Sequence, residues 1–348
     1  MRFRSIGLLA LAALLLSGCA GTPEIPRPTP VHFRACQVSE RNTDTQSDSE
    51  QITYALQKAK IANGIHLLRA AVTLSKTSTE AVLEPMLKHN CSLVVTSGQA
   101  MAPLAAKAAA LHASVNFLSV VYDDSLNEFA ANAANFRTIQ FNVKGAAFLA
   151  GYAAASTSKV GTVAVIGGKP TARTKQYVQG FKDGVAHYNE VQAADVMVLG
   201  DELTSPTYVG STSDASLVQT AAAQAYAFGA DVVFVAAGPA STGAGAVATL
   251  EKTQLIFTDS DWWFDPAADA FKEQILTAAV VNLQTLVYAN TVAALQNQFS
   301  TIRTSLVADL ANAGTGLATT HNAAFSVSLA NELAQLTKDI NDGKVTIQ

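Results

Sequence analysis

Acidic and aromatic side chains stand together at one point of the chain. Asp259 and Asp261 come directly after an apolar run, and Trp262 and Trp263 follow them. A carboxylate at the end of a buried strand can accept hydrogen bonds from hydroxyl groups, and an indole ring offers a flat apolar face to a planar ligand. Each Asp could equally cap the helix that follows. Neighbouring residues of a strand point to opposite sides, so we expect only one tryptophan, taken as Trp262, to face a ligand.

Glycine-rich tails follow several other apolar runs. Gly98 lies in the tail 96–99, residues 167–170 hold two glycines, and Gly238 precedes Pro239. Glycine lets the backbone approach a ligand closely, and free amides at a helix start can donate hydrogen bonds to it. Gly98 and Gly238 are therefore candidate ligand-binding residues, although loops between strands and helices are commonly rich in glycine for their turn geometry alone.

The sequence contains no pattern that is typical of an enzyme. Its 6 histidines are scattered, and no pair has metal-binding spacing. It has no Gly-x-Ser-x-Gly elbow. The segment 238–243 lacks the Lys and the Ser or Thr of a phosphate-binding loop. We therefore expect a binding protein, with no catalytic residue, no cofactor and no metal site.

The elements that must position these residues alternate between strand and helix. Short, largely apolar runs predict strands buried on both faces, and the stretches between them predict helices such as 102–112, 144–156 and 175–188. Repeated alternation favours parallel sheets with right-handed crossovers, and the chain is long enough for two of them. Ligands then bind beyond the carboxyl ends of the strands. The expected strands are 32–38, 66–72, 92–96, 115–121, 160–166, 195–199, 231–236, 254–258 and 275–281.

The N-terminus has the pattern of a lipoprotein signal. Arg2 and Arg4 precede an apolar run, and Leu-Ser-Gly-Cys ends at Cys19. The run is too short for a stable transmembrane helix, which needs about 20 apolar residues. We expect a signal peptide over 1–18, lipidation of Cys19 and a proline-rich tether over 19–30. The folded body would then be anchored to a membrane on its extracytoplasmic face, in the periplasm or at the cell surface. An ordinary cleaved signal or a membrane anchor is the alternative.

Composition indicates a globular body without a surface for nucleic acid. Hydrophobic residues make up 49% and charged residues 14% of the chain, and the formal net charge is -4, which gives no basic field. Cys36 and Cys91 are the only cysteines besides Cys19, and both lie at or near expected strands. In an oxidising compartment they could form a disulfide, and two buried free thiols are the alternative.

Four segments of the chain match one protein family in their order and spacing. They are Phe-Leu-Ala-Gly-Tyr at 148–152, the glycine-punctuated segment 159–181, the segment 229–238 and Asp-Ser-Asp at 259–261. Together with the tail 312–345 they resemble the basic membrane protein family of bacterial lipoproteins, which contains purine nucleoside receptors of ABC importers. The resemblance extends over essentially the whole body that follows the signal.

This resemblance implies an α/β, two-lobed periplasmic-binding-protein-like fold of type I, in which each lobe is a parallel sheet flanked by helices. It implies one lobe from 31–138 plus 239–279 and a second from 139–238 plus 280–348, with a cleft that closes on a ligand. It also implies a nucleoside-like small molecule as ligand and an ABC permease in the membrane as partner.

Two further site candidates come from the family pattern. The resemblance implies an acidic residue near Asp44 in the first polar loop and an Asn at Asn135. Asp48, in the same loop, is interpreted as part of a solvated turn with a helix cap. The family's aromatic residue is absent from this loop, and Val281 stands where the family usually has Lys. Nucleoside specificity is therefore implied by kinship and not by matched contacts.

The sequence as a whole predicts a lipid-anchored receptor of an ABC importer for a nucleoside or a similar heterocyclic solute. A sensory or scaffold lipoprotein that uses the same fold without a transport role is the alternative, and the altered first loop and Val281 leave room for it. A hydrolase is a third hypothesis, which turnover of a bound nucleoside would reveal.

Overall fold

The computed structural model describes residues 32–41, 46–75, 77–98, 100–122, 133–200, 207–301 and 305–347. In these ranges the chain forms two six-stranded sheets. The expected signal peptide 1–18, Cys19, the tether 19–30 and Asp44 lie outside the described residues. Among the helices that are described, none is long and apolar enough to cross a membrane.

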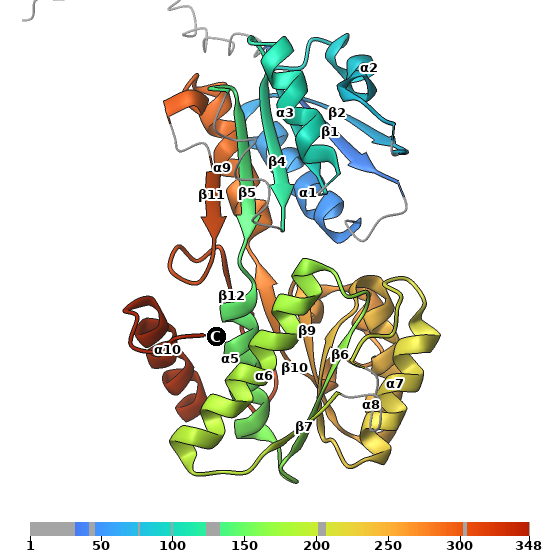
Figure 1. The fold of residues 1–348 in the computed structure, drawn as a ribbon, viewed down its shortest axis with the longest axis vertical. Helices are drawn as coiled ribbons and strands as arrows, with labels where there is room; N and C mark the ends of the chain where they lie inside the picture. The colour runs from blue at the N-terminus through green and yellow to red at the C-terminus, as the bar shows by residue number, and fades with distance from the viewer. Residues whose placement is uncertain are drawn as a thin grey trace, which may run out of the picture. The chain divides into compact units, whose positions relative to one another are not determined.

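The first sheet has the strand order β2-β1-β3-β4-β5-β11, and every neighbouring pair in it is parallel. Together with α1 (Gln46–Asn63), α3 (Met101–Leu111) and α9 (Leu283–Leu295) it forms what we call the first lobe (Figure 1). The short helix α2 (Glu84–Leu87) also belongs to it. Its strands are β1 (Arg34–Glu40), β2 (His66–Val72), β3 (Leu93–Ser97), β4 (Asn116–Val121), β5 (Phe136–Phe141) and β11 (Ser305–Ala308).

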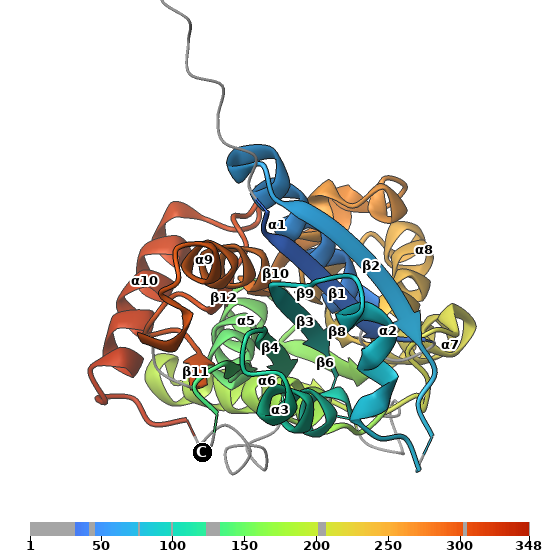
Figure 2. The same ribbon diagram turned by 90° about the horizontal axis from the view of Figure 1, so that it is seen from above.

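The second sheet has the strand order β12-β10-β9-β8-β6-β7, in which β12 is antiparallel to β10 and the other pairs are parallel. We call this sheet and its helices the second lobe. Helices α5 and α6 pack on each other, as do α7 and α8 (Figures 1 and 2). Its strands are β6 (Thr162–Gly167), β7 (Met197–Leu199), β8 (Val232–Ala236), β9 (Gln254–Asp259), β10 (Ile275–Val281) and β12 (Thr315–Leu317). Its helices are α5 (Lys144–Thr157), α6 (Ala172–Gln192), α7 (Ala215–Ala227), α8 (Thr242–Glu251) and α10 (Val327–Asn341).

The predicted α/β class and the nine expected strands are confirmed, each strand lying within about two residues of its expected bounds. Two of them, β2 and β10, have the bounds that the sequence predicts. The pattern missed β5 and the short edge strands β11 and β12. The apolar run of β5 is interrupted by Arg137, Thr138 and Gln140. All three are buried, so polar residues in a buried strand concealed it from an argument based on hydrophobicity.

The predicted division into lobes is wrong in two ranges. Residues 239–279 were expected in the first lobe, yet β9 pairs with β8 and β10 in the second sheet. Conversely, α9 and β11 belong to the first lobe, although 280–348 was expected in the second. The run β8-α8-β9 is one continuous crossover unit within a single sheet, so the chain has no reason to change lobes after β8. Figure 1 shows the changes after β5, β10 and β11 instead.

Close approach of α5 to α6 explains two glycines of the second lobe. A Cβ at Gly151 would overlap the carbonyl oxygen of Phe181, and a Cβ at Gly184 would overlap that of Phe148. Only glycine permits this spacing between the helices. The contact fixes α6, whose first turn carries a residue of the site described below.

A disulfide joins Cys36 of β1 to Cys91, which precedes β3, with the two Cα atoms 5.8 Å apart. The sequence left this bond open. The order β2-β1-β3 makes β1 and β3 direct neighbours, which is the condition that brings the two cysteines within bonding reach. The bond crosslinks the core of the first lobe.

Candidate functional site

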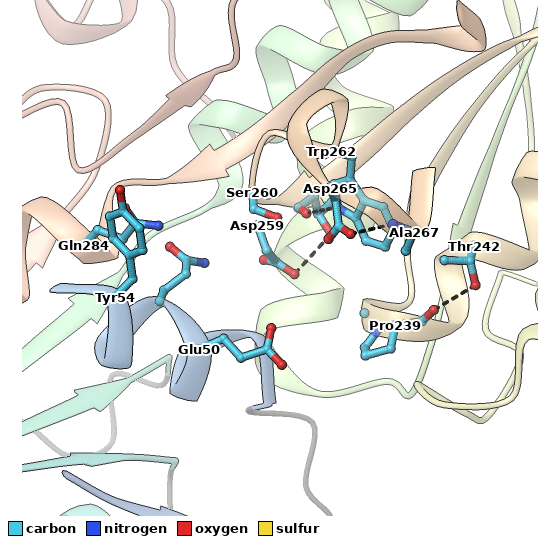
Figure 3. Close-up of a pocket in the computed structure, with 13 residues that line it drawn as sticks. Glu50, Tyr54, Pro239, Thr242, Asp259, Ser260, Trp262, Asp265, Ala267 and Gln284 are labelled. Atoms are coloured by element: carbon cyan, nitrogen blue, oxygen red, sulfur yellow. Dashed lines mark hydrogen bonds between the residues drawn. The ribbon is translucent and has the colours of Figure 1, made fainter. Parts of the chain in front are cut away.

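A cavity of about 420 Å³ lies between α1 and α9 of the first lobe and the strand ends of the second lobe. In Figure 3, Glu50 and Tyr54 of α1 stand on one side, and Asp259 and Trp262 on the other. Its ionisable carboxyl groups belong to Glu50, Asp259 and Asp265, and no Lys, Arg or His lines it in the described residues. The lining residues are Glu50, Gln51, Tyr54, Gly238, Pro239, Thr242, Thr258, Asp259, Ser260, Trp262, Asp265, Ala267 and Gln284.

Asp259 is the last residue of β9, and its carboxylate accepts hydrogen bonds from its own lobe. Its φ of 77° lies in the left-handed region, which residues other than glycine adopt rarely. The oxygen Oδ1 accepts a hydrogen bond of 2.7 Å from the Tyr177 hydroxyl and another from the Arg173 guanidinium. The oxygen Oδ2 accepts one of 3.3 Å from the Thr258 hydroxyl.

Arg173 lies in the first turn of α6, directly after the loop that follows β6. Its guanidinium contacts Asp259 of its own lobe and lies 3.3 Å from Asp48 of the first lobe. It also stacks 3.9 Å from the centre of the Tyr122 ring, and the Tyr122 hydroxyl donates a 2.6 Å hydrogen bond to Asp48. We call Asp48, Tyr122, Arg173, Tyr177 and Asp259 the interlobe ion cluster.

The interlobe ion cluster is buried and carries one cation for two carboxylates. The Asp48 side chain is 0% exposed and that of Arg173 13%. Burial raises the pKa of the Asp48 carboxyl, and Arg173 offsets this only in part. Burial acts to lower the pKa of Arg173, but Asp259 and its other neighbours outweigh that effect and raise it well above its ordinary value. The guanidinium therefore stays charged.

The two phenols of the cluster act as hydrogen-bond donors. Burial raises the pKa of Tyr122 well above its ordinary value, and the same holds for Tyr177. Both therefore keep their protons and donate hydrogen bonds, Tyr122 to Asp48 and Tyr177 to Asp259. Arg173 and the two phenols thus hold both carboxylates of the cluster through hydrogen bonds.

The structure brings three of the sequence candidates to the cavity. Gly238, with a φ of 55°, follows β8. Asp259 ends β9 and Trp262 follows it, so the ends of two neighbouring strands meet at the cavity. Trp262 is only 8% exposed. Its indole Nε1 donates 3.0 Å to the Thr258 carbonyl and its ring stacks on Phe257, so most of the ring serves the core.

The other candidates lie elsewhere. Asp261 caps a short turn by accepting 3.2 Å from the Trp263 amide, and it lines a neighbouring cavity of about 220 Å³ together with Val281. Gly98, with a φ of 104°, follows β3 and donates its amide to the Val120 carbonyl.

Asn135 lies at the amino end of β5, the edge opposite the carboxyl ends where the site is built. Its amide donates to the carbonyls of Ala109, His112 and Val115 at 3.0, 3.1 and 2.7 Å. These bonds tie the connection between α3 and β4 to the start of β5. In the structure Asn135 therefore joins backbone segments and does not line the cavity.

Sequence reasoning missed four members of the interlobe ion cluster. Arg173 and Tyr177 follow the end of β6, and Tyr122 directly follows β4, so the strand-end argument applied to Asp259 could have found them. Asp48 was interpreted as a solvated turn residue, whereas it lies in the first turn of α1 and is fully buried. Among the described residues, no group of three or more His, Cys, Asp or Glu side chains is placed to hold a metal ion.

Residues 41–344 match the family model described as ABC transporter substrate-binding protein, PnrA-like. The chain belongs to this family. The resemblance drawn from the four sequence segments is thereby confirmed.

The chain is 26% identical over 202 residues to Basic membrane protein D of Borreliella burgdorferi, a match that covers 58% of this chain and 54% of the relative. It is 22% identical over 246 residues to Basic membrane protein A1 of Borrelia garinii subsp. bavariensis, covering 69% and 66%. The chain thus spans about half the length of the first of these relatives.

Solved structures agree with the two-lobed fold. A solute-binding protein of an ABC transporter system from Conexibacter woesei aligns with a TM-score of 0.73 at 19% identity, over 91% of this chain and 98% of that one. A transcriptional activator of the comK gene from Bacillus halodurans aligns with a TM-score of 0.71 at 16% identity, over 91% and 100%. At these identities the likeness shows the periplasmic-binding-protein-like fold alone, which serves more than one kind of protein.

Proposed function

We propose that this family member is a lipid-anchored, extracytoplasmic receptor that binds a nucleoside or similar heterocyclic solute and delivers it to an ABC permease. The observation that carries the proposal is the cavity between the lobes, with its aromatic residues and its acidic lining. A volume of about 420 Å³ suits a small organic ligand. In this fold class, a cleft at the strand ends is the place where a ligand joins two lobes.

The polar groups of the cavity suit a neutral solute with hydroxyl groups and a planar ring. The second oxygen of Asp259 accepts a 3.3 Å hydrogen bond from the Thr258 hydroxyl and can accept another from a sugar hydroxyl. The amide Nε2 of Gln51 is buried and has no hydrogen-bond partner among the described residues, so it can donate to a ring nitrogen or carbonyl. The ring of Tyr54, 58% exposed, offers an apolar face to a base.

The acidic lining disfavours anionic solutes. Glu50, Asp259 and Asp265 line the cavity, and Val281 lies in the neighbouring cavity where the family usually has Lys. Close like charges repel, and desolvation strengthens the effect. Phosphorylated nucleotides should therefore bind less tightly than the corresponding nucleosides.

A thermal-shift panel of nucleosides, nucleotides and amino acids tests the ligand class. A ligand at 100 times its dissociation constant adds about 2.7 kcal/mol to the free energy of unfolding. A nucleoside should raise the unfolding midpoint, its nucleotide should raise it less, and Asp259→Ala should abolish the nucleoside effect. Full nucleoside affinity in Asp259→Ala would remove this residue from the site. Mass spectrometry of small molecules released from freshly purified protein identifies the solute directly.

Anchoring is tested by metabolic labelling with a radioactive fatty acid. The wild type should incorporate label and Cys19→Ser should not. Equal labelling of the two proteins would contradict lipidation at Cys19. The transport role is tested separately by uptake of the labelled solute in cells with and without the gene, because a sensory lipoprotein would bind the solute without changing its uptake.

A further inference from the structure

The interlobe ion cluster joins the two lobes through side chains of the protein itself. Asp48 belongs to α1 of the first lobe, while Arg173 and Asp259 belong to α6 and β9 of the second. The Arg173 Nη1 atom lies 3.3 Å from Asp48 Oδ1 and 3.4 Å from Oδ2, and the Nη2 atom donates to Asp259. One guanidinium therefore bridges two carboxylates that come from opposite sides of the interface between the lobes.

The surroundings of this guanidinium are those of a bound cationic ligand. An aromatic ring from the first lobe covers one of its faces, since the Tyr122 ring centre lies 3.9 Å away. Its planar fork matches the carboxylate oxygens, and burial of the Asp48 carboxylate removes competing water. Its Nε atom is buried and has no hydrogen-bond partner within the described residues. The cluster therefore has the composition of a binding site for a guanidinium or ammonium group.

In a two-lobed receptor the solute makes contacts to both lobes and thereby favours the closed arrangement. Here Arg173 already makes such contacts. We propose that Arg173 is a built-in ligand: its guanidinium fills the position in which a cationic group of a solute would bridge Asp48 and Asp259, and it holds the lobes together without a solute. Arg173 is thus a specificity-determining residue of the interface.

This assignment also narrows the solute class, a step that rests on the proposed function. Because Arg173 supplies the positive charge between Asp48 and Asp259, the solute does not need one. It binds beside the cluster, in the cavity reached by the second oxygen of Asp259 and by Gln51. A neutral solute fits this site. A solute that must close the lobes through its own cation does not, because Arg173 already occupies the position of that cation.

Small-angle scattering of solute-free protein tests the bridge. Every protein carries Cys19→Ser in the full-length chain, so that none bears an acyl chain. The wild type should be compact, and Arg173→Met should have a larger radius of gyration because the lobes lose their common cation. Lys175→Met is the matched control, since Lys175 is exposed two residues further along the same helix and its removal changes the charge equally. An Arg173→Met protein as compact as Lys175→Met would overturn the proposal.

A second variant keeps the test available if Arg173→Met does not fold. Asp48→Asn keeps the volume of the side chain and removes the charge that the first lobe contributes. Its radius of gyration should be larger than that of the wild type and smaller than that of Arg173→Met. No increase in a folded Asp48→Asn protein would contradict the bridging role.

Chemical rescue tests whether the position is a cation site. Arg173→Ala leaves a space between Asp48 and Asp259, and methylguanidinium should fill it. Millimolar methylguanidinium chloride should raise the unfolding midpoint of Arg173→Ala and reduce its radius of gyration, with sodium chloride as the salt control. It should change neither quantity in the wild type or in Lys175→Ala. An equal response of all three proteins, or none in Arg173→Ala, would overturn the proposal.

These experiments separate the inference from the proposed function. None of them uses a nucleoside, so the bridge can be shown in a protein that binds some other solute. Conversely, coinciding scattering curves of Arg173→Met and Lys175→Met would overturn the bridge only. The proposed function would still stand if a nucleoside stabilises the wild type.

Discussion

The two lobes contribute to the site in different ways. The second lobe supplies groups that are already fixed by contacts within that lobe: Tyr177 donates to Asp259, and Trp262 is held by Phe257 and the Thr258 carbonyl. The first lobe supplies Asp48 and Tyr122, which contact each other and meet the second lobe through Arg173. The comparison indicates that the second lobe is the preorganised half of the site and that the first lobe completes it.

The lobes also differ in how their cores are held. In the second lobe, α5 and α6 approach so closely that Gly151 and Gly184 have no room for a Cβ. In the first lobe, a covalent bond between Cys36 and Cys91 closes a loop with a sequence separation of 55. The stability of the first lobe should therefore depend on redox conditions, whereas the second lobe contains no cysteine and its stability should not.

Loss of the disulfide should lower stability by an amount similar to the loss of the most buried aromatic ring near the site. Paired Cys36→Ser and Cys91→Ser changes should lower the free energy of unfolding by about 4 kcal/mol, because a loop of this length is no longer constrained in the unfolded chain. Neither cysteine lines the cavity, so solute affinity at a temperature where the variant is folded should not change. Urea unfolding with and without a reducing agent measures the loss. Titration of two free thiols in the unfolded, unreduced wild type would show that the bond is absent.

The adjacent tryptophans provide a test of the second lobe. Trp262→Ala should cost about 3–5 kcal/mol, because a buried ring stacked 4.6 Å from Phe257 leaves a cavity in the core. Trp263→Ala should cost about 1 kcal/mol, because Trp263 is only partly buried and stacks on His321. Thermal unfolding of the two variants gives the comparison. Equal losses would contradict the assignment of Trp262 to the core.

Asn135→Ala separates structure from binding in the first lobe. The change should lower the free energy of unfolding by about 1–3 kcal/mol, because three backbone carbonyls lose their donor. Solute affinity should stay that of the wild type, since Asn135 lies at the amino ends of the strands. Calorimetric titration with the identified solute measures this. A large loss of affinity without loss of stability would restore Asn135 as a binding residue.

The smallest expected effect is a pH dependence from Asp48. Burial raises the pKa of Asp48 in the folded protein above its value in the unfolded chain. Between these two values only the folded protein holds the proton, so the free energy of unfolding falls as the pH rises through this window. In Asp48→Asn the free energy of unfolding should fall less steeply with pH, because this carboxyl group is absent. Glu40, whose pKa burial also raises, still contributes in the same direction. Urea midpoints of both proteins over the acid range measure the difference, and identical slopes would contradict it.

The sequence by itself determined most elements of the fold and the edge of the sheet at which binding residues were expected. Runs such as 66–72 and 275–281 locate strands because a strand buried on both faces must be apolar along its length. Gly238, Asp259 and Trp262 could be predicted to lie together because the ends of neighbouring parallel strands meet at one edge of a sheet, and all three line the cavity. The same local arguments failed for β5, where buried polar residues break the apolar run.

Only the tertiary structure decided which residues meet. Arg173 is 125 positions from Asp48 and 86 from Asp259 in the sequence. No local pattern therefore predicts that this guanidinium lies between a carboxylate of the first lobe and one of the second. Asp48 looks like an exposed turn residue in sequence, yet it is buried and its partners Tyr122 and Arg173 come much later in the chain. The distribution of strands between the sheets likewise follows from pairing. Hydrophobic pattern acts over a few residues, whereas ion pairing and strand pairing depend on distances in space that the folded chain alone establishes.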